Sequence, residues 1–209
     1  GTQFKKFVKP FNAHGYQVVS FDAIGHGRSA GRQSNILYFI KTIEQLSRQF
    51  NFAGVVGHSI GGATAIHALI NRRFTDKLIL IGSPATSENV YGPFLRALQA
   101  SQSTLNFFLT YTEQKFGRSF ASFAIENVIS QLDQVDLLII HDHEDLDVSI
   151  DNAHLIFKLY DHAELITTRG LGHTRILKDK QVIQHCLNFI QNSKINEPKK
   201  SSKTANINN

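Results

Sequence analysis

Two hydrophobic periodicities alternate along the chain and predict alternating helices and strands. Phe4, Phe7, Val8 and Phe11 recur at helical spacing, so the first segment is expected to be an amphipathic helix that ends near residues 14–15. The same spacing predicts further helices over residues 34–50, 59–73, 148–160 and 178–191. Short apolar runs predict strands over residues 16–21, 53–57, 77–81, 137–140 and 164–168. Such strands, separated by helices, are typical of a mostly parallel sheet covered on both faces, in which ligands bind beyond the carboxyl ends of the strands.

One long stretch interrupts this alternation. Between the strands at 77–81 and 137–140 lie some fifty residues without a strand pattern, and they hold six of the 16 Phe of the chain. An insertion of this length in an α/β unit is usually functional or disordered, and this one is too aromatic to be disordered. We expect a helical cap over the strand ends at about residues 84–131. The alternative is that these are ordinary helices packed at the edge of the domain.

Composition places the chain among single-domain globular proteins. Its 209 residues are 42% hydrophobic and 19% charged, and no apolar run is long enough for a membrane-spanning helix. The single cysteine, Cys186, excludes an intramolecular disulfide and weakly favours a cytoplasmic location. The net charge of +5 does not indicate a nucleic-acid partner, because residues 193–209 carry a net +3 and leave +2 for residues 1–192. We therefore expect one domain over residues 1–192 and a disordered basic tail over 193–209.

The strongest chemical signal is the segment Gly57-His58-Ser59-Ile60-Gly61-Gly62, between a predicted strand and a predicted helix. It matches G-x-S-x-G in the strand–turn–helix setting that projects a serine hydroxyl from a sharp turn. Small residues two before and two after the serine would let the chain pass closely, and the helix N-terminus would point N–H groups at a forming oxyanion. Ser59 is the predicted nucleophile, and the backbone N–H of Ile60 is the predicted oxyanion donor.

A serine hydroxyl needs a base, and the base needs an orienting acid. His173 follows the last predicted strand in a loop that also contains Gly170 and Gly172, so it is the predicted base. The acid is expected after the preceding strand, where the segment from residue 141 to 147 offers four carboxylates. These are Asp142, Glu144, Asp145 and Asp147.

At this point the chain resembles the serine hydrolases of the α/β-hydrolase fold over residues 1–192. The motifs that carry the resemblance are GHSIGG, DAIGHGRS (residues 22–29), HDHEDLDV (residues 141–148) and GLGH (residues 170–173). The family pattern H-G-x-x-D-x-x-V implies that Asp145 is the acid, with Asp147 as the alternative. Asp142 stands where the family usually has Gly. The order Ser59, Asp145, His173 agrees with the order of this family, and the resemblance implies that the DAIGHGRS segment lines the pocket rather than reacts.

Other cofactor chemistry finds little support. His141-x-His143-x-Asp145 resembles part of a metallo-β-lactamase motif, but Leu146 stands where that motif ends in His. No phosphate-binding glycine motif is present. We expect no cofactor, no metal and no nucleotide.

The resemblance also implies parts that precede Gly1. A second oxyanion donor normally comes from a loop that would end near Gly1, and the first strands of the family sheet would lie upstream. We expect the natural protein to have on the order of 50–90 additional upstream residues, from typical strand and loop lengths.

Together these observations predict a serine hydrolase that cleaves an ester or thioester through an acyl-enzyme, with an apolar small-molecule substrate. A C–C bond hydrolase with the same triad and a non-catalytic binding protein of the same fold are the alternatives. Neither the substrate nor the oligomeric state follows from the sequence.

Overall fold

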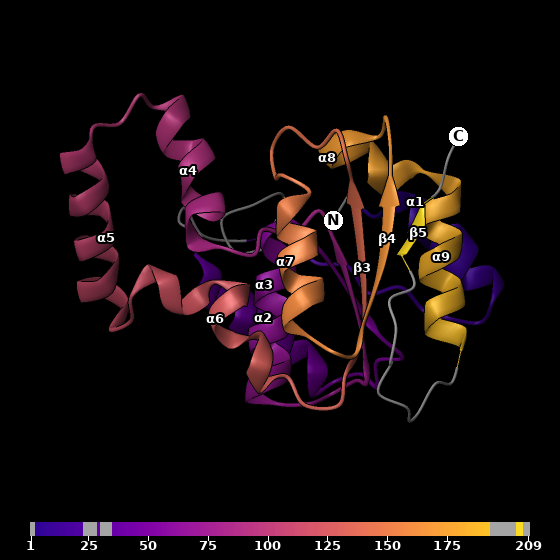
Figure 1. The fold of residues 1–209 in the computed structure, drawn as a ribbon. Coiled ribbons are helices and arrows are strands. Elements are labelled where there is room, and N and C mark those ends of the chain that lie inside the picture. The colour runs from indigo at the N-terminus through magenta and orange to yellow at the C-terminus, as the bar shows by residue number, and fades with distance from the viewer. Residues whose placement is uncertain (1–2, 23–28, 30–34, 193–203, 207–209) are drawn as a thin grey trace.

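A computed structural model describes residues 3–22, 29, 35–192 and 204–206. Its centre is a parallel sheet in the order β1-β2-β3-β4-β5, with bounds Val55–His58, Lys77–Ile81, Asp136–Asp142, Ala163–Thr168 and Thr204–Asn206. The predicted parallel α/β architecture is confirmed (Figure 1). Because all strands run the same way, the residues that follow β1 to β4 share one edge of the sheet (Figure 1).

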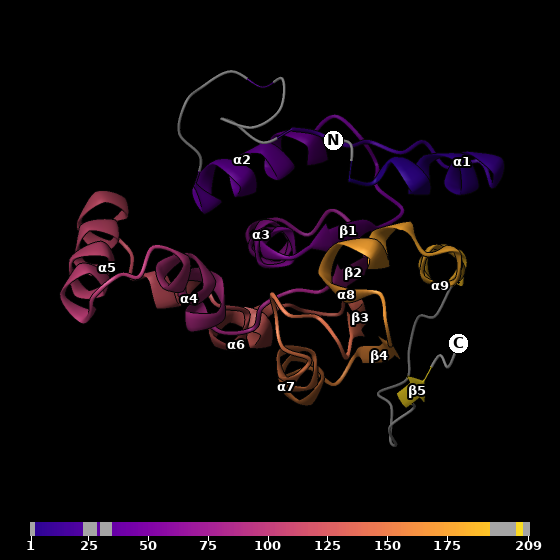
Figure 2. The same ribbon diagram turned by 90° about the horizontal axis from the view of Figure 1, so that it is seen from above.

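Alternate residues of the central strands enter two separate apolar cores. Leu78, Leu80 and Leu137 pack with residues of α3 (Ile60–Asn71), α6 (Ile125–Val128) and α7 (Asp151–Leu159) on one face. Ile79 and Leu138 pack with residues of α1 (Lys5–Ala13) and α9 (Lys180–Gln191) on the other. Figure 2 shows these two helix layers on either side of the strands. Since both faces are covered, the strands are continuous apolar runs rather than alternating ones.

Helix ends are set by capping side chains. α2 (Ile36–Ser47) packs against α3, and the Asn35 side chain accepts a hydrogen bond from the N–H of Tyr38 at its start. Asp179 caps α9 in the same way by accepting from the N–H of Val182. Such caps satisfy N–H groups that have no acceptor within the helix.

The segment between β2 and β3 is helical, as predicted. It holds α4 (Ser87–Ala97), α5 (Gln102–Phe116), the 3₁₀ turns η1 (Phe120–Phe123) and η2 (Ile129–Gln131), and α6. Its second part behaves as an ordinary core element, since Ile125 and Ile129 are fully or almost fully buried in the α3–α7 core. By contrast, α4 and α5 extend away from the sheet, with α5 farthest out (Figures 1 and 2).

The expected strand at residues 16–21 does not form, since these residues lie outside helices and strands. Tyr16 and Val18 instead pack against the core formed with α1 and α9. The side chains of an apolar run can be buried in a core without any regular structure. The run becomes a strand only when a neighbouring backbone pairs with it. The prediction was therefore wrong in element type.

Two further predicted segments are described only in part. The predicted disordered tail differs from the structure at Thr204–Asn206, which form β5 beside β4, because an edge strand offers backbone partners to any extended segment. The rest of residues 193–209 and most of DAIGHGRS lie outside the described residues, apart from Asp22 and Ser29. Among the helices of the described ranges, none combines the length and the apolarity needed to cross a membrane.

Candidate active site

Ser59 occupies the sharp turn between β1 and α3. Its backbone has φ +53° and ψ −130°, a left-handed conformation that costs energy for a residue with a side chain. The Ser59 N–H donates to the carbonyl of Ile81 at 3.0 Å, which ties the turn to the end of β2. Ile60 is the first residue of α3, so its N–H has no acceptor within that helix.

The glycines around this turn are not equally constrained. A Cβ at Gly57 would lie 2.7 Å from both the Gly61 carbonyl oxygen and the Gly62 Cα, so the chain does pass too closely for a side chain there. A Cβ at Gly62 would lie 2.2 Å from Ser83 Oγ. At Gly61 a Cβ would meet nothing within 4 Å. The expectation that a close approach of the chain requires glycine therefore holds for Gly57 and is wrong for Gly61. After the serine, the tightly packed glycine is Gly62.

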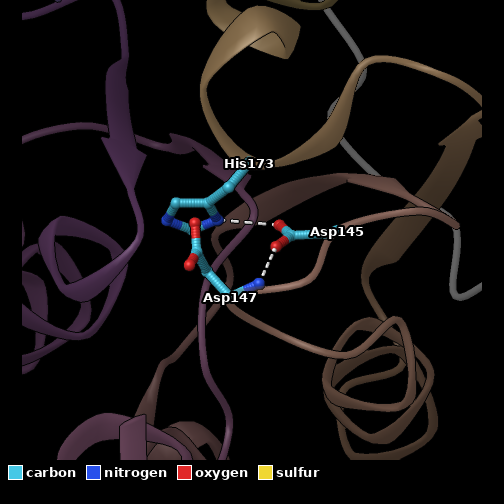
Figure 3. A group of neighbouring side chains, drawn as sticks. All are labelled: Asp145, Asp147 and His173. Carbon is cyan, nitrogen blue, oxygen red and sulfur yellow. Dashed lines mark hydrogen bonds and ion pairs between the residues drawn. The ribbon is translucent and has the colours of Figure 1, made fainter. Parts of the chain in front are cut away.

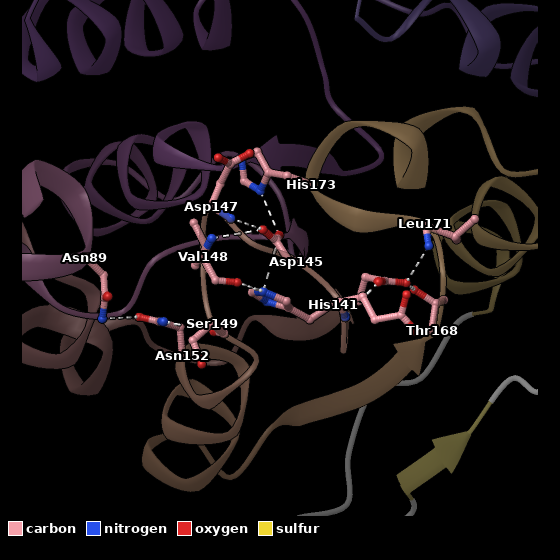
Figure 4. Close-up of polar contacts among 12 residues, drawn as sticks. Asn89, His141, Asp145, Asp147, Val148, Ser149, Asn152, Thr168, Leu171 and His173 are labelled. Carbon is pink, nitrogen blue, oxygen red and sulfur yellow. Dashed lines mark hydrogen bonds and ion pairs between the residues drawn. The ribbon is translucent and has the colours of Figure 1, made fainter. Parts of the chain in front are cut away.

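Asp145 lies in the loop after β3, with its side chain 1% exposed. Its Oδ1 accepts a hydrogen bond from the N–H of Asp147 at 2.9 Å, and its Oδ2 lies 2.7 Å from His173 Nδ1 (Figure 3). Oδ1 also accepts from the N–H of Val148 at 2.9 Å (Figure 4). Burial alone would raise the pKa of Asp145. The hydrogen bonds from His173, Val148 and Asp147 and the charge of His173 outweigh it, so the pKa is lowered and the carboxylate stays ionised.

His173 lies in the short helix α8 (Gly172–Arg175) that follows β4. Its pKa is raised, chiefly by the hydrogen bond to Asp145; burial opposes this, and the charges of Asp145 and Asp147 add to it. Asp145 Oδ2 can only accept, so Nδ1 carries the proton and Nε2 is the ring atom free to act as a base. The structure therefore brings the predicted acid and the predicted base into direct contact.

Ser59 is close to this pair but is not bonded to it. Among the described contacts, no hydrogen bond joins Ser59 to His173. Two residues next to the serine turn lie against the pair: Gly82, which follows the Ile81 that accepts the Ser59 N–H, and His58, which precedes Ser59. A Cβ at Gly82, directly after β2, would lie 3.3 Å from both His173 Nδ1 and Asp145 Oδ2, and His58 Nε2 lies 2.8 Å from the carbonyl oxygen of His173. Hydrogen bonds between nucleophile and base are often absent before substrate binds.

Asp142 was one of the four carboxylates that the sequence offered, but its structural role was not predicted. Asp142 is 0% exposed, and its Oδ2 accepts from the Thr168 hydroxyl at 2.6 Å and from the Leu171 N–H at 3.1 Å. Its Oδ1 accepts from the N–H of Glu144 at 2.9 Å. Its only signal in the sequence was that it replaces the usual Gly of the family pattern. Asp142 thus joins the loop that carries Asp145 to the loop that carries His173.

His141 contacts the loop that carries the predicted acid, Asp145. Its Nε2 lies 2.8 Å from the carbonyl oxygen of Val148 and 3.6 Å from Asp145 Oδ2 (Figure 4). Burial lowers the pKa of His141, despite the hydrogen bond to Val148 and the charge of Asp145. A carbonyl only accepts, so His141 donates there from Nε2 as a neutral imidazole.

The described residues contain one group with metal-ligand geometry, namely Asp145, Asp147 and His173, whose ligand atoms lie within 4.8 Å of one another (Figure 3). Both Asp145 oxygens and His173 Nδ1 already serve hydrogen bonds within the group. A metal at this position would have to displace them.

A parallel sheet with a serine at the first strand–helix turn, an acid after β3 and a histidine after β4 defines an α/β-hydrolase. The family model described as serine aminopeptidase, S33, matches residues 1–169. The chain therefore belongs to this family of hydrolases.

Solved structures agree on the fold. A bromoperoxidase from Bacillus anthracis superposes with a TM-score of 0.71 at 17% identity, over 92% of this chain and 88% of that one. An esterase from Exiguobacterium antarcticum gives 0.65 at 19% identity, over 91% and 87%. A meta-cleavage product hydrolase from Pseudomonas fluorescens IP01 gives 0.63 at 19% identity, over 88% and 83%. No curated protein sequence matches the chain.

Proposed function

We propose that the chain is a serine hydrolase that cleaves an ester or thioester through an acyl-enzyme. Ser59 is the nucleophile, His173 the general base and acid, Asp145 the orienting acid and the Ile60 N–H an oxyanion donor. The observation that carries the proposal is the 2.7 Å hydrogen bond between His173 Nδ1 and Asp145 Oδ2. The positive φ of Ser59 at the strand–helix turn supports it.

The reaction follows from the atoms available. Ser59 Oγ attacks the acyl carbon while His173 Nε2 takes its proton, and the Ile60 N–H stabilises the negative oxygen of the tetrahedral intermediate. Asp145 holds the imidazolium that forms. Nε2 then returns the proton to the leaving alcohol or thiol as its bond to the acyl carbon breaks. Water, deprotonated by the same Nε2, releases the acid and restores Ser59.

The local electrostatics suit these roles. Asp145 is held ionised by its hydrogen bonds, so it favours the protonated form of His173 during the reaction. The hydrogen bond to Asp145 raises the pKa of His173, so the imidazole is a stronger base than a free one.

The aromatic residues of the α4–α5 region support an apolar substrate. A groove of about 690 Å³ between these helices is lined in part by Tyr91, Leu95 and Leu105. Behind it, the rings of Tyr91, Phe108 and Phe120 pack against one another. Glu88, Gln99 and Gln102 line the same groove, so its walls are mixed and the apolar preference rests on the ring cluster.

A fluorophosphonate probe tests the proposal, because it phosphonylates an activated serine without needing the natural substrate. We expect the wild-type protein to be labelled and Ser59→Ala not to be. Equal labelling of both, or none of either, would contradict the assignment.

Substrate panels then separate the reaction types. Nitrophenyl esters of increasing chain length should be cleaved faster with longer acyl groups. Cleavage of aminoacyl nitroanilides in preference to esters would replace the ester assignment with an aminopeptidase one. Labelling of Ser59 without turnover of esters, amides or vinylogous diketones would favour a binding protein.

A further inference from the structure

His58 and His173 form a contact that the proposed mechanism does not use. His58 is the last residue of β1 and directly precedes Ser59, whereas His173 lies in α8, more than a hundred residues further along the chain. His58 Nε2 lies 2.8 Å from the backbone carbonyl oxygen of His173. The two rings also pack together, with centroids 4.6 Å apart and planes inclined by 42°.

The chemistry of this contact assigns the proton. A carbonyl oxygen can only accept, so His58 must carry a hydrogen on Nε2 and donate it. The groups that act electrostatically on His58 are His173, Asp145 and His141. Burial lowers the pKa of His58, and the charge of His173 lowers it further, while the hydrogen bond to the His173 carbonyl and the charge of Asp145 oppose this. His58 therefore stays a neutral donor while its neighbour takes the proton.

We propose that His58 is a positioning residue for the base: its Nε2–H holds the backbone of His173, and its ring holds the ring of His173 at the serine turn. This inference rests on the proposed function. Among the described hydrogen bonds none joins Ser59 to His173, so the bond from His58 ties the nucleophile turn to the backbone of the base.

Three variants separate the donor from mere packing. His58→Leu removes the N–H and keeps an apolar side chain. His58→Gln restores an N–H at the position of Nε2. The control is His67→Leu. His67 is a buried histidine of α3 whose Nε2 also faces a carbonyl oxygen, that of Phe123 at 3.4 Å, but it does not contact His173 among the described residues.

The first readout is the rate of fluorophosphonate labelling of folded protein. We expect His58→Leu to slow labelling by about 10- to 100-fold, since a displacement of about 1 Å at a reacting group has effects of this size. His58→Gln should recover most of the loss, and His67→Leu should lower the melting temperature without slowing labelling. Wild-type rates for His58→Leu, or equal loss in His58→Leu and His58→Gln, would overturn the role of the Nε2–H bond.

The second readout does not depend on activity. In protein with ¹⁵N-labelled histidine, long-range ¹H–¹⁵N spectra report which nitrogen of each ring carries the hydrogen. We expect His58 to be a single Nε2–H tautomer, and the Nδ1–H of His173 to give a sharp downfield signal in wild type and His58→Gln that broadens in His58→Leu. A mixture of tautomers at His58 overturns the inference even if the protein labels. Conversely, absence of labelling with this spectrum intact would refute the proposed function alone.

Discussion

The Asp142 carboxylate accepts a hydrogen bond of 2.6 Å from the Thr168 hydroxyl, across the ends of β3 and β4. Asp145 follows β3 and His173 follows β4, so this bond and the one from the Leu171 N–H fix the two loops relative to each other. Burial alone would raise the pKa of Asp142. Hydrogen bonds from Thr168, Gly172, Glu144 and Leu171 outweigh it and lower the pKa.

Replacing Asp142 should therefore affect both stability and turnover. We expect Asp142→Ala to lower the free energy of unfolding by about 1–3 kcal/mol, since it leaves the buried Thr168 hydroxyl and the part-buried N–H groups of Glu144 and Leu171 without their acceptor. Turnover should fall because the Asp145–His173 contact loosens. Chemical denaturation and kcat measure the two effects. Asp142→Asn, which keeps one acceptor oxygen, should lose less, and equal stability of all three proteins would contradict the role.

The same carboxylate gives a sign to the pH dependence of stability. A carboxyl whose pKa is lower in the folded state stabilises the protein above its unfolded pKa, and this contribution is lost as the pH falls through the folded value. Melting temperatures of wild type should therefore fall more steeply below about pH 4 than those of Asp142→Ala. Parallel curves would show that Asp142 does not carry this contribution.

Asp145 and Asp147 can be told apart as partners of His173. Asp145→Asn should lower turnover by about 10⁴-fold, because the amide cannot hold the imidazolium and favours the wrong tautomer. Asp147 touches the pair only through its backbone N–H and its charge. Asp147→Asn should therefore keep kcat within a fewfold of wild type. A larger loss in Asp147→Asn than in Asp145→Asn would exchange their roles.

Asp147 should nevertheless shift the pH at which activity appears, although the hydrogen bond to Asp145 contributes most to the raised pKa of His173. The base must be neutral to act, so kcat/KM rises as the pH passes the pKa of His173 in the free enzyme. The charge of Asp147 raises that pKa. Asp147→Asn should shift the acid limb of the kcat/KM profile toward lower pH, and raising the ionic strength should shift the wild-type limb in the same direction. An unchanged or upward-shifted limb would be inconsistent with this charge effect.

The parts of the fold that follow from local pattern were predictable. The strand at 77–81 was predicted with its observed bounds, and those that became β3 and β4 differ only at their ends, because a strand buried on both faces is an uninterrupted apolar run. Parallel topology then placed Asp145 and His173 at neighbouring strand ends. Their catalytic roles stay predictions.

What escaped prediction depends on contacts between distant segments. The bonds from Asp142 to Thr168 and from His58 to the His173 carbonyl join residues 26 and 115 positions apart, and nothing local distinguishes those side chains from surface ones. The run at 16–21 failed for a related reason, since strand formation depends on a neighbouring backbone that no local pattern reveals.

The two glycines of the serine turn should respond oppositely to alanine. A Cβ at Gly57 would lie 2.7 Å from backbone atoms of Gly61 and Gly62, which cannot move without shifting α3, so Gly57→Ala should destabilise the protein by about 1–3 kcal/mol. At Gly61 nothing lies within 4 Å, and alanine is the better helix former by about 0.5–1 kcal/mol. Gly61→Ala should therefore be neutral or slightly stabilising. Thermal unfolding compares the two, and equal destabilisation would refute the steric distinction.

Lys77 should anchor the last turn of α9 to the sheet. Its Nζ donates to the carbonyl oxygens of Phe189 at 2.7 Å and Ile190 at 3.1 Å, and also to that of Asn192. These are carbonyls that a helix end leaves without internal donors, and the cation also favours the negative end of the helix dipole. Lys77→Met keeps the aliphatic stem but not the charge, so we expect a loss of about 1–3 kcal/mol and faster hydrogen exchange in the last turn of α9. The control is Lys180→Met at the exposed start of the same helix, where a cation gains nothing from the dipole and no loss is expected. Equal effects of the two substitutions would show that the charge of Lys77 does not hold this helix end.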